Sequence, residues 1–532
     1  MEIRPLRIAC LFLVTFATVV ACKKDTHPPK MVVINIRGTS FIGLQNYTNN
    51  HPKGYLSSLL QARKVRELMP VNNAVTATSL AAFETGQPPQ VNGVLAHQFA
   101  TKANDSFRIE SGFRKYEVAS FLEKADRAGK SVLNLGSLLL HGATEEHNQL
   151  HALAQGQVLS APQMVTLDAT KEVKIAEGYT FQVFNDNSEI DNRSQWAVGV
   201  PGLEADTIVL QNNQWTNLHL GDFQGLKIRC RVKLLVREGK TDQLFVRSAF
   251  VNRGYPLKEL QQTEKEVGGA VGWPSIGLYL NGQIDVQTIK EEIQNEVSYV
   301  LDIFELKLDK GYDLITMDYP VMDRYGHLFS LSPSSSHTAE AYALLEKDLE
   351  RLVKLSQNNG YQVMIQSGHG FAKAHTEINL NDALDSLTNI KSNQILPIPG
   401  KISAHLYLGP DFSKGKKEAL IHQISLWKDS KSGASIIEAV CSKEKLDDLG
   451  LLNPNAGDIY VLLKPGYLFS SSRSNEGNIF KPAQFRGDHG YTSSLPENRG
   501  VLLHPGLELP DSIIHITDLA GFILNYLAVQ TE

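Results

Sequence analysis

A short apolar run followed by spaced polar residues constrains the fold of this chain more than any other feature. Residues 314–317 form a mostly apolar run, as in a strand of a parallel sheet covered by helices on both faces. Asp323 and His327 follow on what we expect to be the loop after the carboxyl end of that strand. Open α/β sheets bind their ligands at that end. A carboxylate and an imidazole four residues apart can share one cation, and zinc is the usual choice.

Other apolar runs and helical patterns alternate along the chain. Further buried strands are predicted over about residues 31–36, 131–135, 361–366 and 501–503. Helices are predicted over about residues 55–68, 76–86, 116–129, 289–304, 336–355 and 518–527. This alternation predicts an α/β fold with a mostly parallel central sheet sandwiched by helices.

Two stretches interrupt the alternation of strands and helices. From about 158 to 251 the pattern becomes that of half-buried strands, with strict alternation of apolar and basic residues over 226–234. We expect a β-rich inserted lobe there and a mixed lobe at about 402–467, both within one domain over 31–527. The basic residues of the alternating strand would form either a solvated face or a binding surface for an anionic ligand; they are Lys227, Arg229, Arg231 and Lys233.

The N-terminus has the pattern of an export signal. Arg4 and Arg7 precede an apolar run that ends at Cys22, a pattern that resembles a bacterial lipobox. We predict a lipoprotein signal peptide over residues 1–21, lipidation of Cys22 and a tether over residues 22–30. The protein would then be lipid-anchored in the bacterial cell envelope, facing the periplasm or the surface, rather than spanning a membrane. The alternative is a plain signal peptide with an incidental cysteine.

Composition and cysteine content add two expectations. A charged fraction of 20% and a net charge of −5, without a basic tail, do not predict nucleic-acid recognition. Cys230 and Cys441 are the cysteines that remain in the body of the chain. They are either buried free thiols or a disulfide pair, which the sequence does not decide.

Several short motifs occur in a fixed order along the chain. They are Arg37-Gly38 after the first strand, Thr76, Thr85-Gly86, Asn92-Gly93-Val94, Asp323-x-x-x-His327, Ser367-x-His369-Gly370 and His489-Gly490-Tyr491. Together they resemble the alkaline phosphatase superfamily, and most closely its type I phosphodiesterase/nucleotide pyrophosphatase branch, over about residues 31–527. The resemblance implies the fold of that branch and metal-dependent hydrolysis of phosphoric esters.

The resemblance also implies roles for individual residues. Asp323, His327 and His489 match the ligands of the first of two zinc ions, which together clamp the attacking and leaving oxygens. Thr76 matches the nucleophile, at a helix N-terminus whose dipole favours an alkoxide. His369 matches a ligand of the second ion.

Three positions depart from the family pattern. Arg37 and Gly368 stand where the two carboxylates of the second metal site belong, and Thr78 replaces a proline after the nucleophile. A dication beside a guanidinium, without those carboxylates, should bind poorly, so we expect one zinc ion and a degenerate second site. Arg37 either replaces the lost ion in binding a phosphoryl oxygen or pairs with an acid. We do not expect the neighbouring Asp488 to restore the site.

Two functions are compatible with these residues. The first is an atypical exported hydrolase of a phosphodiester, pyrophosphate or phosphomonoester, with one metal ion, Thr76 as nucleophile and Arg37 as the electrostatic substitute for the second ion. The second is a pseudoenzyme, a surface lipoprotein that binds an anion or a protein without turnover. The expected ligand is a small phosphate ester or another anion in either case.

Overall fold

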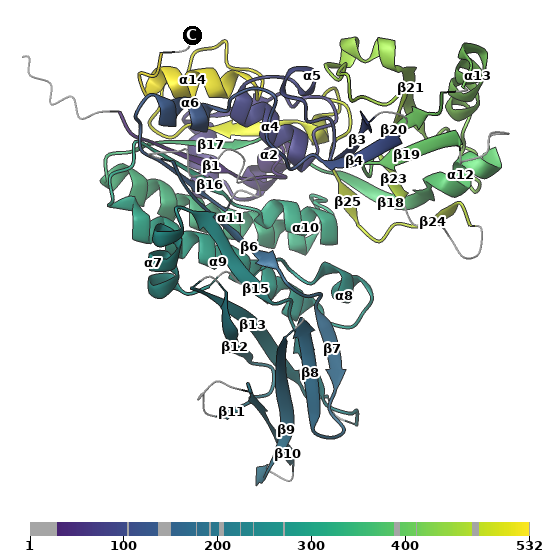
Figure 1. Ribbon diagram of the computed structural model, residues 1–532. Coiled ribbons are helices and arrows are strands. Elements are labelled where there is room, and N and C mark those ends of the chain that lie inside the picture. Colours follow the sequence, from purple (N-terminus) through teal and green to yellow (C-terminus); the bar gives the residue numbers. More distant parts are fainter. Residues whose placement is uncertain are drawn as a thin grey trace, which may run out of the picture.

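Five parallel strands form the centre of the largest sheet (Figure 1). In spatial order they are β17 (Gln362–Ser367), β1 (Met31–Asn35), β16 (Leu314–Asp318), β5 (Val132–Leu135) and β6 (Leu150–Val158). Asn35 at the end of β1 lies opposite Asp318 on one neighbour and Gln366 on the other. The carboxyl ends of these three strands therefore meet at one edge of the sheet, and the predicted α/β class is confirmed. Beyond β17 the sheet becomes mixed, because β26 (Gly500–Leu503) and β2 (Val65–Leu68) add antiparallel edge strands.

The computed structural model describes residues 29–530, apart from 104–105, 137–149, 177, 191–192, 202–206, 224, 238, 270–271, 388–393, 411 and 471–477. The predicted signal peptide over residues 1–21, Cys22 and most of the tether lie outside the described residues. Within the described part of the chain, no helix combines the length and the apolar character that crossing a membrane requires.

Helices cover both faces of the parallel strands. On β1, Val32 and Ile34 point into a core that includes side chains of α9 (Val286–Leu308) and α11 (Ser336–Asn358). Met31 and Val33 point into the opposite core, with α4 (Thr76–Thr85), α6 (Phe121–Arg127) and α14 (Asp518–Tyr526). Because successive side chains of a strand alternate between its faces, one uniformly apolar strand serves two cores.

The β-rich insertion continues the same sheet. From β6 the order is β15 (Phe250–Tyr255), β13 (Leu226–Leu235), β14 (Gln243–Val246) and β7 (Gln163–Thr166), all antiparallel, with β12 (Trp215–Phe223) also paired to β13. A separate sheet contains β11 (Ile208–Val209), β10 (Arg193–Gly199), β9 (Tyr179–Ile190) and β8 (Lys171–Ala176). Figure 1 shows the insertion extending away from the helices around the parallel strands.

Acidic side chains pair with two of the four basic residues of β13. Lys233 is fully buried and lies 2.7 Å from Glu291 of α9, while Arg229 lies 3.5 Å from Glu264 of α7 (Leu257–Val267). Lys227 remains exposed. Our expectation of a solvated or anion-binding face is therefore wrong for Lys233 and Arg229, which pair with acids of α9 and α7.

The mixed lobe has its own core. Strands β19 (Ile395–Pro399), β20 (Ser403–Leu408), β22 (Ile459–Leu463) and β21 (Ile437–Ser442) form its sheet, packed with α12 (Leu380–Leu387) and α13 (Lys414–Ser425). A neighbouring small sheet centres on β18 (Ala372–Asn379), which pairs with β23 (Gly466–Ser470), β24 (Phe480–Pro482) and β25 (Gly487–Asp488). The strand β25 leads directly to His489.

One predicted helix is partly wrong. We expected helix over residues 55–68, but α3 covers Tyr55–Gln61 and residues 65–68 form β2. Arg63 has a φ of 57°, a left-handed conformation that a helix does not accept, so the helix ends before it. The next residues then pair with β26, and tertiary pairing outweighs the local helical preference.

Candidate metal and active site

Asp323 and His327 lie one turn apart on α10 (Val321–Phe329), which begins three residues after β16. Our expectation of a loop is therefore wrong, although the four-residue spacing still places both side chains on one helix face. The Nε2 atom of His327 lies 3.8 Å from Oδ1 of Asp323. Gly326 lets this helix approach the rest of the site, because a Cβ there would lie 2.8 Å from the ring of Phe371.

His489 completes this group from the other end of the chain. Its Nε2 atom lies 3.6 Å from the same Oδ1 atom of Asp323. The Nδ1 atom of His489 donates a hydrogen bond to the carbonyl of Ala74, and that of His327 donates to the carbonyl of Gly487. Since a carbonyl can only accept, both Nδ1 atoms carry hydrogen, and in the neutral tautomer of each ring the lone pair lies on the Nε2 atom that faces Asp323. This arrangement orients imidazoles as metal ligands.

The two oxygens of Asp323 have different surroundings. Oδ2 faces two guanidinium groups, at 3.4 Å from Arg324 and 3.6 Å from Arg37. Oδ1 is buried and has no hydrogen-bond partner among the described residues. Burial raises the pKa of Asp323, but nearby positive charge, with the guanidinium of Arg37 first, outweighs it and holds the pKa well below its usual range. A charged, unpartnered oxygen facing two Nε2 lone pairs fits a bound cation.

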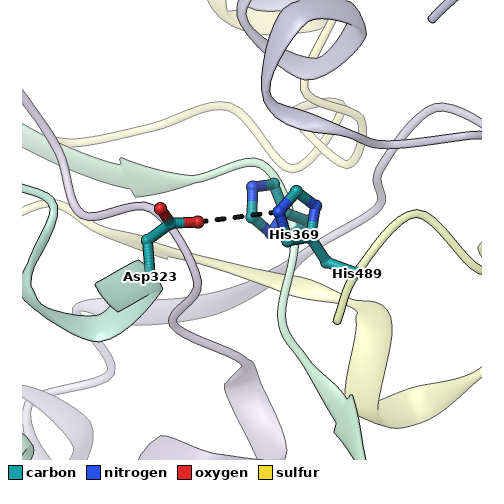
Figure 2. A group of neighbouring side chains, drawn as sticks. All are labelled: Asp323, His369 and His489. Atoms are coloured by element: carbon teal, nitrogen blue, oxygen red, sulfur yellow. Dashed lines mark ion pairs between the residues drawn. The ribbon is translucent and has the colours of Figure 1, made fainter. Parts of the chain in front are cut away.

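His369, the remnant of the second site, stacks on His489. The ring centroids are 3.9 Å apart and the planes are inclined by 12°. Ligand atoms of Asp323, His369 and His489 lie within 4.8 Å of one another (Figure 2). Burial lowers the pKa of His369 well below its usual value, so the ring is neutral, and its Nε2 atom has no partner in the described structure. His369 is thus also available as a ligand.

Arg37 is paired with an acid. Its Nε atom donates to Oδ1 of Asp318 at 3.0 Å, and its Nη2 atom lies 2.9 Å from Oδ2. Asn35 also donates to Asp318, from Nδ2 at 3.0 Å. Because Asp318 binds Nε and Nη2 on one edge of the guanidinium and Nη1 faces Asp323, the positive charge of Arg37 is already balanced by carboxylates.

Other side chains fill the place of the second missing carboxylate. A Cβ atom at Gly368 would lie 2.1 Å from Oγ of Ser79 and 2.3 Å from Cδ1 of Ile516. Restoring both acids by Arg37→Asp and Gly368→Asp therefore also requires room to be made at Ser79 and Ile516. A side chain at position 368 therefore fits only if Ser79 and Ile516 move.

Thr76 is the first residue of α4, and its helix begins beside His489. Val75 precedes it as the N-cap without a side-chain hydrogen bond, and the carbonyl of Ala74 accepts from His489. Thr78, in place of the family's proline, donates to the carbonyls of Asn73 and Val75 and so fixes the turn. The positive end of the helix dipole thus points toward the same region as the metal-competent residues.

His97 also lies near this site and was not predicted from the sequence. Burial, together with the charge of His489, lowers the pKa of His97 to about 3, and Asp323, His327 and Arg37 also act on it. Its Nδ1 atom is buried and unpartnered within the described residues. His97 belongs to none of the motifs, so no sequence pattern identified it.

Comparisons with known proteins support the fold and a family. The model of the type I phosphodiesterase/nucleotide pyrophosphatase family matches residues 31–492. Among solved structures, phosphonoacetate hydrolase from Sinorhizobium meliloti in complex with phosphonoacetate has a TM-score of 0.56 and 11% identity, covering 94% of this chain and 96% of that one. Murine ectonucleotide pyrophosphatase/phosphodiesterase 5 in complex with AMP has a TM-score of 0.52 and 11% identity, covering 95% and 96%. No curated protein matches the sequence.

Proposed function

Because the chain belongs to the type I phosphodiesterase/nucleotide pyrophosphatase family, we propose that it is an exported phosphoric-ester hydrolase with a single zinc ion. One observation carries this proposal: the buried Oδ1 atom of Asp323 has no partner among the described residues and faces the Nε2 atoms of His327 and His489. The substrate class is a phosphodiester, a pyrophosphate or a phosphomonoester.

Different residues would bind the metal ion, attack phosphorus and stabilise the phosphoryl charge. Asp323, His327 and His489 would hold the zinc ion, which supplies positive charge that stabilises the oxygens of the reacting phosphoryl group. The hydroxyl of Thr76 attacks phosphorus as its proton passes to water, and the bond from phosphorus to the leaving oxygen breaks. The helix N-terminus at Thr76 favours the negative charge on the phosphoryl group. Water then hydrolyses the phosphothreonine and regenerates the hydroxyl.

Metal content and a nucleophile variant test the proposed hydrolase. We expect about one zinc per chain by elemental analysis, and turnover of at least one member of a panel of phosphomonoesters, diesters and pyrophosphates. Thr76→Ala should lower kcat at least ~10³-fold at unchanged zinc content, because the attacking oxygen is removed. Thr85→Ala makes the same change at the far end of the helix and should retain activity. A zinc-loaded protein that hydrolyses nothing on the panel would contradict the proposal.

A second candidate function is binding without turnover. The pairing of Arg37 with Asp318 and the filled space at Gly368 favour it, because they remove the second centre of positive charge from the reacting phosphoryl group. The same experiment separates the two functions. One bound zinc without turnover, together with binding of a phosphate ester, would establish this alternative.

We also propose that the protein is anchored in the bacterial cell envelope by a lipid on Cys22. The basic residues, apolar run and terminal cysteine at residues 1–22 support this. Mass spectrometry of the protein purified from membranes should find a mature chain that begins at a lipidated Cys22. In Cys22→Ala the protein should leave the membrane fraction. An unmodified Cys22 in a membrane-free protein would rule the anchor out.

A further inference from the structure

Asp488 is a buried carboxylate without an assigned role. It is 2% exposed and ends β25, immediately before His489. Its Oδ1 atom accepts a hydrogen bond from the backbone N–H of His489 at 2.9 Å. Its Oδ2 atom is buried and has no hydrogen-bond partner in the described part of the chain. A buried carboxylate oxygen left unpaired is costly, and a bound cation is one way to offset that cost.

Asp488 lies beside two histidines whose ring nitrogens could bind a metal ion. One carboxylate oxygen of Asp488 lies within 4.8 Å of ligand atoms of both His327 and His489, which are themselves that close to each other. Both histidines use Nδ1 for backbone carbonyls, so their Nε2 atoms remain for a metal. Gly487 makes the approach possible, because a Cβ atom there would lie 2.8 Å from the carbonyl oxygen of Gly326 on α10.

The charges around Asp323 leave a bound dication only partly neutralised, so a second carboxylate ligand would stabilise it. The Oδ2 atom of Asp323 is shared between Arg37 and Arg324, so Asp323 offers a cation less than a full negative charge. Two carboxylates would neutralise a dication. Asp488 is a buried acid beside His327 and His489, and its Oδ2 atom has no hydrogen-bond partner among the described residues. Zinc accepts carboxylate oxygens together with imidazoles.

We propose that Asp488 joins Asp323, His327 and His489 as a ligand of the single metal ion. In the metal-free chain Asp323 and Asp488 belong to two groups of ligand atoms that share His489, so the ion would draw the two carboxylates together. This inference rests on the proposed function for the presence of the ion. Four protein donors are typical of closed zinc sites, whereas catalytic sites usually have three and an open position. The fourth donor should therefore increase the affinity for zinc, and a phosphoryl oxygen would bind as a fifth ligand.

Zinc affinity and apoprotein stability test this ligand together. Asp488→Asn keeps the shape of the side chain and should weaken zinc binding at least ~10-fold in a chelator competition. The metal-free variant should be no less stable than the wild type, since a buried unpaired charge is removed. Asp348→Asn is the control: that carboxylate is also buried but accepts from the hydroxyl of Tyr319, so its loss should leave zinc affinity unchanged.

A cysteine variant provides a direct readout. In Asp488→Cys loaded with Co²⁺, a thiolate-to-metal charge-transfer band should appear, and Asp348→Cys should lack it. Unchanged zinc affinity in Asp488→Asn, or no such band in Asp488→Cys, would overturn the ligand role while one zinc per wild-type chain kept the proposed function. A wild-type chain without zinc would instead refute the proposed function itself.

Discussion

Replacing Asp318 by asparagine is expected to lower the free energy of unfolding of the metal-free protein by about 3–5 kcal/mol. Arg37 is 5% exposed, and Asp318 binds both Nε and Nη2 of its guanidinium. An arginine cannot shed its charge at any accessible pH, so removing Asp318 leaves a buried cation facing Asp323 alone at 3.6 Å. Urea unfolding in the presence of a chelator measures the effect.

Two further variants show whether the lost charge pair is the cause. Asp348→Asn removes a buried carboxylate whose partner is a neutral hydroxyl, and should cost only about 1 kcal/mol. Adding Arg37→Met to Asp318→Asn should recover most of the loss, because a buried ion pair replaced as a whole is often nearly neutral. If Asp318→Asn lowers the free energy of unfolding no more than Asp348→Asn does, then Asp323 and the rest of the site neutralise Arg37 without Asp318.

The pairing of Arg37 with Asp318 shows why the site was only partly predictable. The motifs identified Asp323, His327 and His489, and the structure places both Nε2 atoms within 4 Å of Asp323 Oδ1. The partner of Arg37 could not be read from the sequence, because Asp318 is 281 positions away and reaches it through the register of β1 and β16. The free oxygen of Asp488 likewise depends on how β25 packs against α10.

The fold was predictable where local patterns and burial agree. The mostly apolar runs form the central strands β1 and β16, and the segments with a long helical period form α9 and α11. The prediction failed where a distant partner decided the outcome. Residues 65–68 form a strand paired with β26 and not the predicted helix. Arg229 and Lys233 of β13 form ion pairs with acids of α7 and α9. Neither partner lies nearby in the sequence, so no local pattern indicated them.

Glu84 makes the stability of the protein depend on pH. It lies on α4, is 4% exposed and accepts a hydrogen bond from the hydroxyl of Tyr116 at 2.8 Å. Burial raises the pKa of Glu84 from 4.5 to about 8; the hydrogen bond from Tyr116 opposes the shift, and Glu123 and Asp318 add to it. The folded protein therefore holds a proton on Glu84 over a range in which the unfolded chain has released it.

Glu84→Gln should consequently stabilise the protein at alkaline pH. Between pH 4.5 and about 8 the unfolded wild type binds fewer protons at this residue than the folded one, so Glu84 costs stability as pH rises, by roughly 1.4 kcal/mol per pH unit. Glutamine cannot ionise, so the variant should gain on the order of 4 kcal/mol at pH 8 and nothing below pH 4.5. Urea unfolding of both proteins across pH 4–9 measures the gain. Glu377→Gln, at a buried glutamate paired with Lys481, should give no such gain. A variant whose stability falls with pH as steeply as the wild type would mean that folded Glu84 ionises normally.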